Sequence, residues 1–123
     1  MKEILTIGTG SFIGGILRYS LSQFIQGKTN SAFPYGTLCV NIAGCFLIGI
    51  VFGICERGNI NFEWRLFLAT GILGGFTTFS AFSYESVALM RGGEFLSAFA
   101  YVAISVFIGL LATFTGMSII KII

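Results

Sequence analysis

The residues of this chain that could do chemistry are few, and most of them lie in one stretch, Gly71–Glu85. This stretch combines glycines, hydroxyl side chains, a carboxylate and regularly spaced phenylalanines within an apolar segment that is long enough to cross a bilayer. Lipid cannot satisfy such polar groups, so they must face protein or a path that contains water or ions. The pattern therefore indicates an ion route through a membrane rather than a catalytic centre.

Catalytic and zinc-binding chemistry has little support. The chain has no histidine, and its three cysteines all lie in one apolar segment, which argues against a zinc site and against a disulfide framework. Arg18 and Glu85 are the charged residues that lie well inside the apolar segments. We expect them to pair with each other, which is the commoner arrangement of charges within a membrane, or else to line the ion route. We expect the chain not to be an enzyme.

Composition points to a membrane protein. Hydrophobic residues make up 55% of the 123-residue chain and charged residues only 10%, whereas soluble domains are about 25% charged. The net charge of +2, without any basic cluster, argues against nucleic acid as a partner. The length predicts a single domain over residues 1–123.

Four apolar segments, separated by short links, predict an all-α membrane protein surrounded by lipid. We place them at about 4–25, 33–55, 62–90 and 95–120, each near or above the roughly 20 residues that a spanning helix needs. The first is too long for the apolar part of a signal peptide, so we expect it to be retained. Positive residues on the two sides of the membrane give a bias too weak to fix one orientation, with Lys2, Arg57, Arg65 and Lys121 on one side and Lys28 and Arg91 on the other.

Small and polar residues recur every four positions in three of these segments, and residues at that spacing are neighbours on a helix surface. Such stripes let helix backbones approach closely in lipid, so ordinary helix packing explains the glycines. It explains Arg18, Asn41 and Tyr101 less well, and an ion route is the other interpretation. The stripes are Gly10, Gly14, Arg18 and Ser22, then Thr37, Asn41, Cys45, Gly49 and Gly53, and finally Ser97, Tyr101, Ser105, Gly109 and Thr113.

The third segment is expected to break in the middle of the membrane. Glycines are poor helix formers and threonines are stiff, so the sequence predicts a helix over 62–73, a non-helical turn at Gly74–Thr78 and a second helix over 79–90. Carbonyls freed by such a break can coordinate a cation, and the N-terminus of a half-helix favours an anion.

Phenylalanines follow the expected break at helical spacing. Phe79 and Phe82 are three residues apart, and Glu85 follows after three more, so all three share one face of the second half-helix. A phenyl ring is negative on its face and positive at its edge, so ring edges can flank an anion. The other interpretation is that the rings only fill the core.

Three motifs resemble the bacterial fluoride channels of the CrcB (Fluc) family, and the resemblance extends over essentially the whole chain. They are residues 14–19 (Gly-Gly-Ile-Leu-Arg-Tyr), 36–44 (Gly-Thr-Leu-Cys-Val-Asn-Ile-Ala-Gly) and 74–83 (Gly-Gly-Phe-Thr-Thr-Phe-Ser-Ala-Phe-Ser). The resemblance implies an antiparallel, dual-topology homodimer in the bacterial inner membrane, with a structural sodium ion at its centre. It implies passive, selective export of fluoride that relieves fluoride toxicity.

The resemblance also implies roles for individual residues. The main-chain carbonyls of Gly74 and Thr77 would hold the sodium ion, and Asn41 would be the pore amide that donates to fluoride. Phe79 and Phe82 would be the rings beside each pathway. The remaining pathway residues would be Ser80, Tyr101, Ser105 and Thr113 on a polar track, with Thr37, Arg18 and Glu85 at polar positions near the pore. The sequence departs from the family pattern at Gly109 and Ala81.

Two other functions are compatible with four short spans. A small dual-topology multidrug transporter would want a carboxylate in the middle of the first span, where this chain has Arg18. The second alternative is a membrane subunit that transports nothing itself. The polar residues of the third segment argue against this function.

Overall fold

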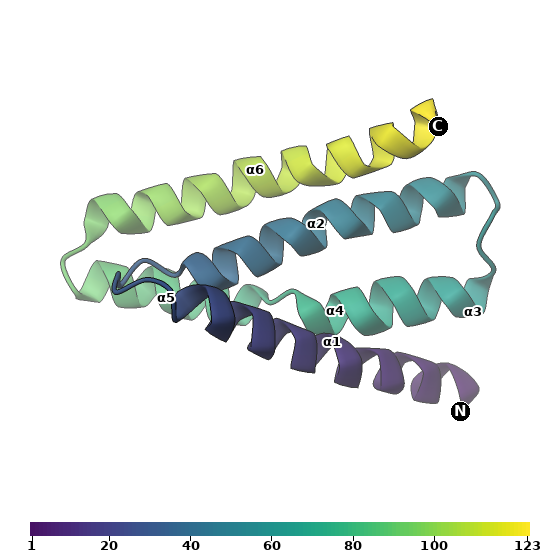
Figure 1. Cartoon of the computed structure of the whole chain (residues 1–123), viewed down its shortest axis with the longest axis horizontal. Helices are drawn as coiled ribbons and strands as arrows, with labels where there is room; N and C mark the ends of the chain where they lie inside the picture. Colours follow the sequence, from purple (N-terminus) through teal and green to yellow (C-terminus); the bar gives the residue numbers. More distant parts are fainter.

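The structure, a computed structural model, describes residues 1–123 and is built only of helices (Figure 1). An α-helix pairs its own backbone polar groups, as the interior of a bilayer demands. Four helical segments are long and apolar enough to cross a membrane. They are α1 (Lys2–Gln26), α2 (Tyr35–Glu56), a third segment composed of α3 (Phe62–Arg65), η1 (Leu66–Leu73), α4 (Gly74–Phe76) and α5 (Phe79–Arg91), and α6 (Phe95–Ile122).

The four spans expected from the sequence are confirmed, with ends displaced by a few residues. α2 begins at Tyr35 because Pro34 occupies the position before the helix, where the missing N–H of proline does no harm. The segments run alternately up and down, so both termini lie at the same end of the bundle (Figure 1). α2 and α6 consequently run in the same direction along one another, while α1 lies against η1 and α4.

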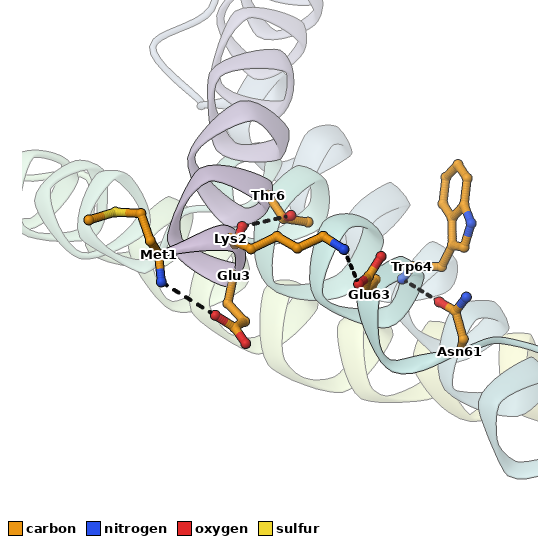
Figure 2. A network of polar contacts seen from close by, with 7 residues as sticks. All are labelled: Met1, Lys2, Glu3, Thr6, Asn61, Glu63 and Trp64. Carbon is orange, nitrogen blue, oxygen red and sulfur yellow. Dashed lines mark hydrogen bonds and ion pairs between the residues drawn. The ribbon is translucent and has the colours of Figure 1, made fainter.

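Polar contacts tie the start of α1 to the start of α3 at the end of the bundle that holds the termini (Figure 2). Lys2 Nζ donates to Glu63 Oε1 at 2.6 Å, and Asn61 Oδ1 accepts from the Trp64 N–H at 2.9 Å and so caps α3. Both members of the ion pair are exposed, so the pair contributes little to stability. The pair marks the point where the third segment enters the bundle beside the start of α1.

Glycines allow the helix backbones to touch, which confirms the packing interpretation of the stripes. A Cβ atom added at Gly49 would collide with the Thr113 carbonyl, and one at Gly116 would collide with the Phe46 carbonyl, so α2 and α6 meet backbone to backbone. A Cβ atom at Gly14 would collide with the Ile72 carbonyl in the same way, where α1 crosses η1. Close backbone approach of this kind drives helix association in lipid.

We therefore expect Gly49→Ala to destabilise the protein. Alanine is the better helix former, but its methyl group would force α2 away from α6, and overpacking of this kind costs about 1–3 kcal/mol. The thermal unfolding midpoint of the purified protein in detergent should fall. Gly8→Ala is the matched control, because a Cβ atom there meets nothing within 4 Å. Equal midpoints for the two variants would contradict the packing role of Gly49.

Candidate functional site

The break in the third segment is two residues long. Thr77 (φ −94°, ψ 154°) and Thr78 (φ −148°, ψ 120°) are extended, which suits β-branched side chains. The Thr78 hydroxyl then accepts from the Ala81 N–H at 3.2 Å and caps α5. The predicted turn at Gly74–Thr78 was too long, because residues 74–76 remain helical as α4.

Contacts with α1 explain why α4 stays helical. A Cβ atom at Gly75 would lie 2.6 Å from the Ser11 carbonyl oxygen, so this glycine serves close packing rather than a turn. Arg18 Nε donates to the Gly75 carbonyl at 3.1 Å and satisfies an acceptor near the end of the helix. The preceding residues Leu66–Leu73 form a π-helix, a form that often occurs at functional sites. Their sequence gives no signal for it.

Asn41 of α2 holds the break from the other side. Its Nδ2 donates to the Thr78 carbonyl at 3.0 Å, and its Oδ1 accepts from the Thr78 N–H at 2.9 Å. Because that N–H goes to Asn41, the Gly74 carbonyl lacks the partner four residues on that an α-helix would supply. The Thr77 carbonyl accepts no hydrogen bond at all within the chain. Main-chain oxygens at the break are thus available to a ligand.

A hollow of about 460 Å³ opens beside the break, and we call it the break hollow. Its walls come from α2, α6 and the third segment on both sides of the break, and they are largely apolar with a few polar groups among them. Ser105 of α6 lines it and has a buried hydroxyl oxygen without a hydrogen-bond partner. A buried polar atom of this kind is uncommon and calls for a ligand or water. The predicted site residues that line the hollow are Asn41, Gly74, Thr77, Phe79, Phe82 and Ser105.

Aromatic rings form one side of the break hollow. Phe79 and Phe82 lie with their centroids 5.4 Å apart, and Phe82 lies 5.3 Å from the ring of Tyr101, both pairs tilted. Phe82 is partly buried, whereas Phe79 is 78% exposed in the single chain. Phe79 is an exposed apolar ring beside an open hollow, about halfway along the bundle. Lipid or a second chain must cover such a surface.

Glu85 lies one turn beyond Phe82 and is held by two hydroxyl groups. Thr37 Oγ1 donates to its Oε1 at 2.7 Å, and the Tyr101 hydroxyl donates to its Oε2 at 2.8 Å. Hydrogen bonds to a carboxylate are stronger than those between neutral groups. The expected pairing of Glu85 with Arg18 is wrong, since Arg18 forms no ion pair and reaches the Gly75 carbonyl instead.

The structure brings together only part of the predicted pathway. Thr37, Tyr101 and Glu85 adjoin the break hollow through the contact of Tyr101 with Phe82. Other members do not line it, although two of them contact residues that do. Thr113 donates to the Cys45 carbonyl at 2.9 Å between α6 and α2, the Ser80 side chain is 3.1 Å from that of Thr78, and Arg18 lies on the α1 side of the break.

Sequence reasoning missed residues that shape the hollow. Ile48 and Val106 form part of its apolar wall, and they look like any other apolar residue of a spanning helix. The backbone of Thr78 is the partner of Asn41. The signal for Thr78 was its type, because threonine before a helix is a favourable N-cap.

Four membrane-capable helices, one of them interrupted beside a partly polar hollow, define a small multi-pass membrane protein. Comparison with known sequences identifies the family. Residues 5–117 match the family described as CrcB-like protein, Camphor Resistance (CrcB). The chain belongs to this family, as the sequence motifs predicted.

Curated relatives in the family share a name. The "Fluoride-specific ion channel FluC" of Flavobacterium psychrophilum is 46% identical, over 98% of this chain and 98% of the relative. A protein of the same name from Thermus thermophilus is 46% identical over 94% of this chain and 91% of its own. That of Rhizobium meliloti is 42% identical over 98% of both.

Proposed function

We propose that this chain is the subunit of a passive, fluoride-selective channel that exports fluoride across the bacterial inner membrane and so relieves fluoride toxicity. The relatives named as fluoride-specific channels support the proposal. The structural observation that carries it is the break hollow, where the Asn41 amide, the partnerless Ser105 hydroxyl and the Phe79 and Phe82 rings line one space.

The break hollow offers weak rather than strong groups to an anion. Moving a small ion from water into a medium of low dielectric constant costs on the order of 20 kcal/mol by the Born estimate, so protein groups must replace much of the hydration. One N–H of the Asn41 amide goes to Thr78, which leaves the second as a donor. The Ser105 hydroxyl and the ring edges of Phe79 and Phe82 are further positive groups. None is charged, and conduction requires sites that an ion can leave.

We assign Thr37, Tyr101 and Glu85 to the part of the ion pathway that follows the Phe79 and Phe82 rings. Tyr101 is fully buried against Phe82, and the carboxylate of Glu85 orients the two hydroxyl groups that donate to it. Ser80, Thr113 and Arg18 lie outside the hollow of one chain. We place them along the pathway only where a second subunit supplies the opposite wall.

We propose an antiparallel homodimer because one chain leaves the site open. Phe79 is 78% exposed beside the hollow, and a second copy related by an axis in the membrane plane would cover it. The weak charge bias permits insertion in both orientations. Labelling of single cysteines placed at either terminus, in a variant without the native cysteines, should find each terminus on both sides of the membrane in cells. If every N-terminus lies on one side, the antiparallel dimer is wrong.

A structural sodium ion at the dimer centre fits the groups at the break. No cluster of histidine, cysteine, aspartate or glutamate that could hold a metal exists in the chain, so a cation would depend on main-chain oxygens. The Thr77 carbonyl accepts no hydrogen bond and the Gly74 carbonyl lacks its helical partner. Carbonyl oxygens suit hard cations. Two such carbonyls from each subunit would hold the ion and fix the two breaks against each other.

Growth of bacteria tests the proposed function in cells. A strain that lacks its own fluoride exporter should regain growth in fluoride-containing medium when it produces this chain. Gly8→Ala should rescue growth equally, because a Cβ atom there meets nothing. Failure to rescue, with the protein present in the membrane, would contradict export of fluoride.

A further inference from the structure

A second groove lies between α1, α2 and the first half of the third segment. It has a volume of about 550 Å³, within the range of about 300–1,000 Å³ that is typical of ligand sites. Its walls are almost wholly apolar and come from α1, α2 and η1 with α4. Leu17, Leu21, Phe24, Leu47 and Phe76 are among them. The groove shares only Leu73 with the break hollow, so its occupant need not touch the ion pathway.

Two polar side chains lie where this groove meets the C-terminal end of α1. A cation at the membrane boundary is followed by a hydroxyl deeper in the membrane, which matches the order of phosphate and ester groups in a phospholipid. Lys28 lies two residues beyond the end of α1, at the membrane boundary, and its ammonium group lies 4.3 Å from the centre of the Phe24 ring. Lys28 forms no ion pair. Ser20, which lines the groove, is four residues before Phe24 and therefore about 6 Å deeper along the helix. Its exposed hydroxyl makes no hydrogen bond within the chain.

Lipid is the occupant that these features fit. Phe24 and Leu17 are 62% and 49% exposed, and in a membrane acyl chains cover apolar surface that protein does not. A cation without a carboxylate partner at the membrane boundary attracts the phosphate of an anionic headgroup. The Ser20 hydroxyl, one helical turn deeper than Phe24, is at the depth of the ester groups that join headgroup and chains.

We propose that this groove is a binding site for an anionic phospholipid. One acyl chain lies along Leu17, Leu21 and Phe76, the phosphate lies on Lys28, and the ester region contacts Ser20. The proposal does not depend on which ion the protein transports, because the groove and the break hollow are separate spaces.

Native mass spectrometry of the purified protein, reconstituted with phosphatidylglycerol or phosphatidylcholine, tests the proposal. The wild-type protein should retain phosphatidylglycerol in preference to phosphatidylcholine. Lys28→Gln should reduce retained phosphatidylglycerol by about fivefold, the effect expected for one basic residue near an anionic surface. Arg91→Gln is the matched control, because Arg91 forms no ion pair and does not line the groove. Arg91 is the last residue of α5, and the link from α5 to α6 lies at the same end of the bundle as the link from α1 to α2 (Figure 1).

A filling substitution distinguishes a lipid site from an interface between two copies of the chain. Leu21→Trp should reduce retention of the lipid while leaving net charge and subunit number unchanged. Equal losses for Lys28→Gln and Arg91→Gln would overturn the proposal in favour of general surface charge. If Leu21→Trp changes the number of subunits and leaves lipid retention intact, the groove is an interface between copies and the lipid site is wrong.

Discussion

Asn41→Asp is expected to cause the largest loss of fluoride flux, of roughly 100-fold. The substitution removes the donor to the Thr78 carbonyl, which Asn41 Nδ2 supplies at 3.0 Å, and it removes the second N–H that the hollow offers to an anion. It also places a negative charge on the wall. At about 5 Å and an effective dielectric constant of about 20, that charge would repel an anion by about 3 kcal/mol, or roughly a 100-fold loss of flux.

The measurement is fluoride efflux from liposomes that contain the purified variant, followed with a fluoride electrode. Asn59→Asp is the matched control, because this asparagine is exposed in the link between α2 and α3 and lines neither cavity. Thermal unfolding of both variants distinguishes loss of the pathway from loss of the fold. Wild-type efflux from a folded Asn41→Asp protein would show that Asn41 only braces the break.

Phe82→Ile is expected to cause the second large loss, of at least about tenfold in flux. Isoleucine keeps an apolar side chain beside Phe79 and Tyr101, whose centroids lie 5.4 and 5.3 Å from that of Phe82. It removes the ring edge that would carry partial positive charge towards the anion. The two ring pairs are worth about 0.5–1.5 kcal/mol each in stability, so the variant should still fold.

Phe107→Ile provides the control for the ring substitution, because Phe107 is 70% exposed on α6 and does not line the hollow. It should conduct at the wild-type rate in the same efflux assay. The same loss as for Phe82→Ile is expected for Phe79→Ile. If both Phe79→Ile and Phe82→Ile conduct like the wild type, the rings serve packing alone.

Much of the fold could be predicted because the bilayer restricts what a chain can do. Each apolar segment must form a helix to pair its backbone groups. The polar links between the segments predicted where each helix ends to within a few residues. The glycine stripes predicted where helices touch, as Gly14 against Ile72 and Gly49 against Thr113 illustrate. The π-helix at Leu66–Leu73 was not predicted, because no local residue preference indicates it.

The candidate site was predicted only in part, because side-chain partners depend on how helices are placed. Asn41 and the phenylalanines were singled out by type and spacing, and the structure puts them on one hollow. That Asn41 would bind both backbone groups of Thr78 depends on the register between α2 and the break. The same dependence explains the wrong pairing of Arg18 with Glu85. Arg18 lies on the α1 side of the third segment, whereas the Glu85 side chain reaches α2 and α6, so each finds nearer partners.

Ion efflux from liposomes that contain the wild-type protein tests the central claim most directly. Vesicles would be loaded with potassium fluoride or potassium chloride at matched protein density. A potassium ionophore would let potassium leave with the anion and so balance the charge, and ion-selective electrodes would record the anion released. The weak uncharged donors of the break hollow predict rapid anion efflux down its gradient. The similarity to channels named as fluoride-specific predicts that this anion is fluoride, with little chloride flux. Equal permeability to chloride, or no anion flux from a correctly folded protein, would contradict the fluoride channel proposed for this chain.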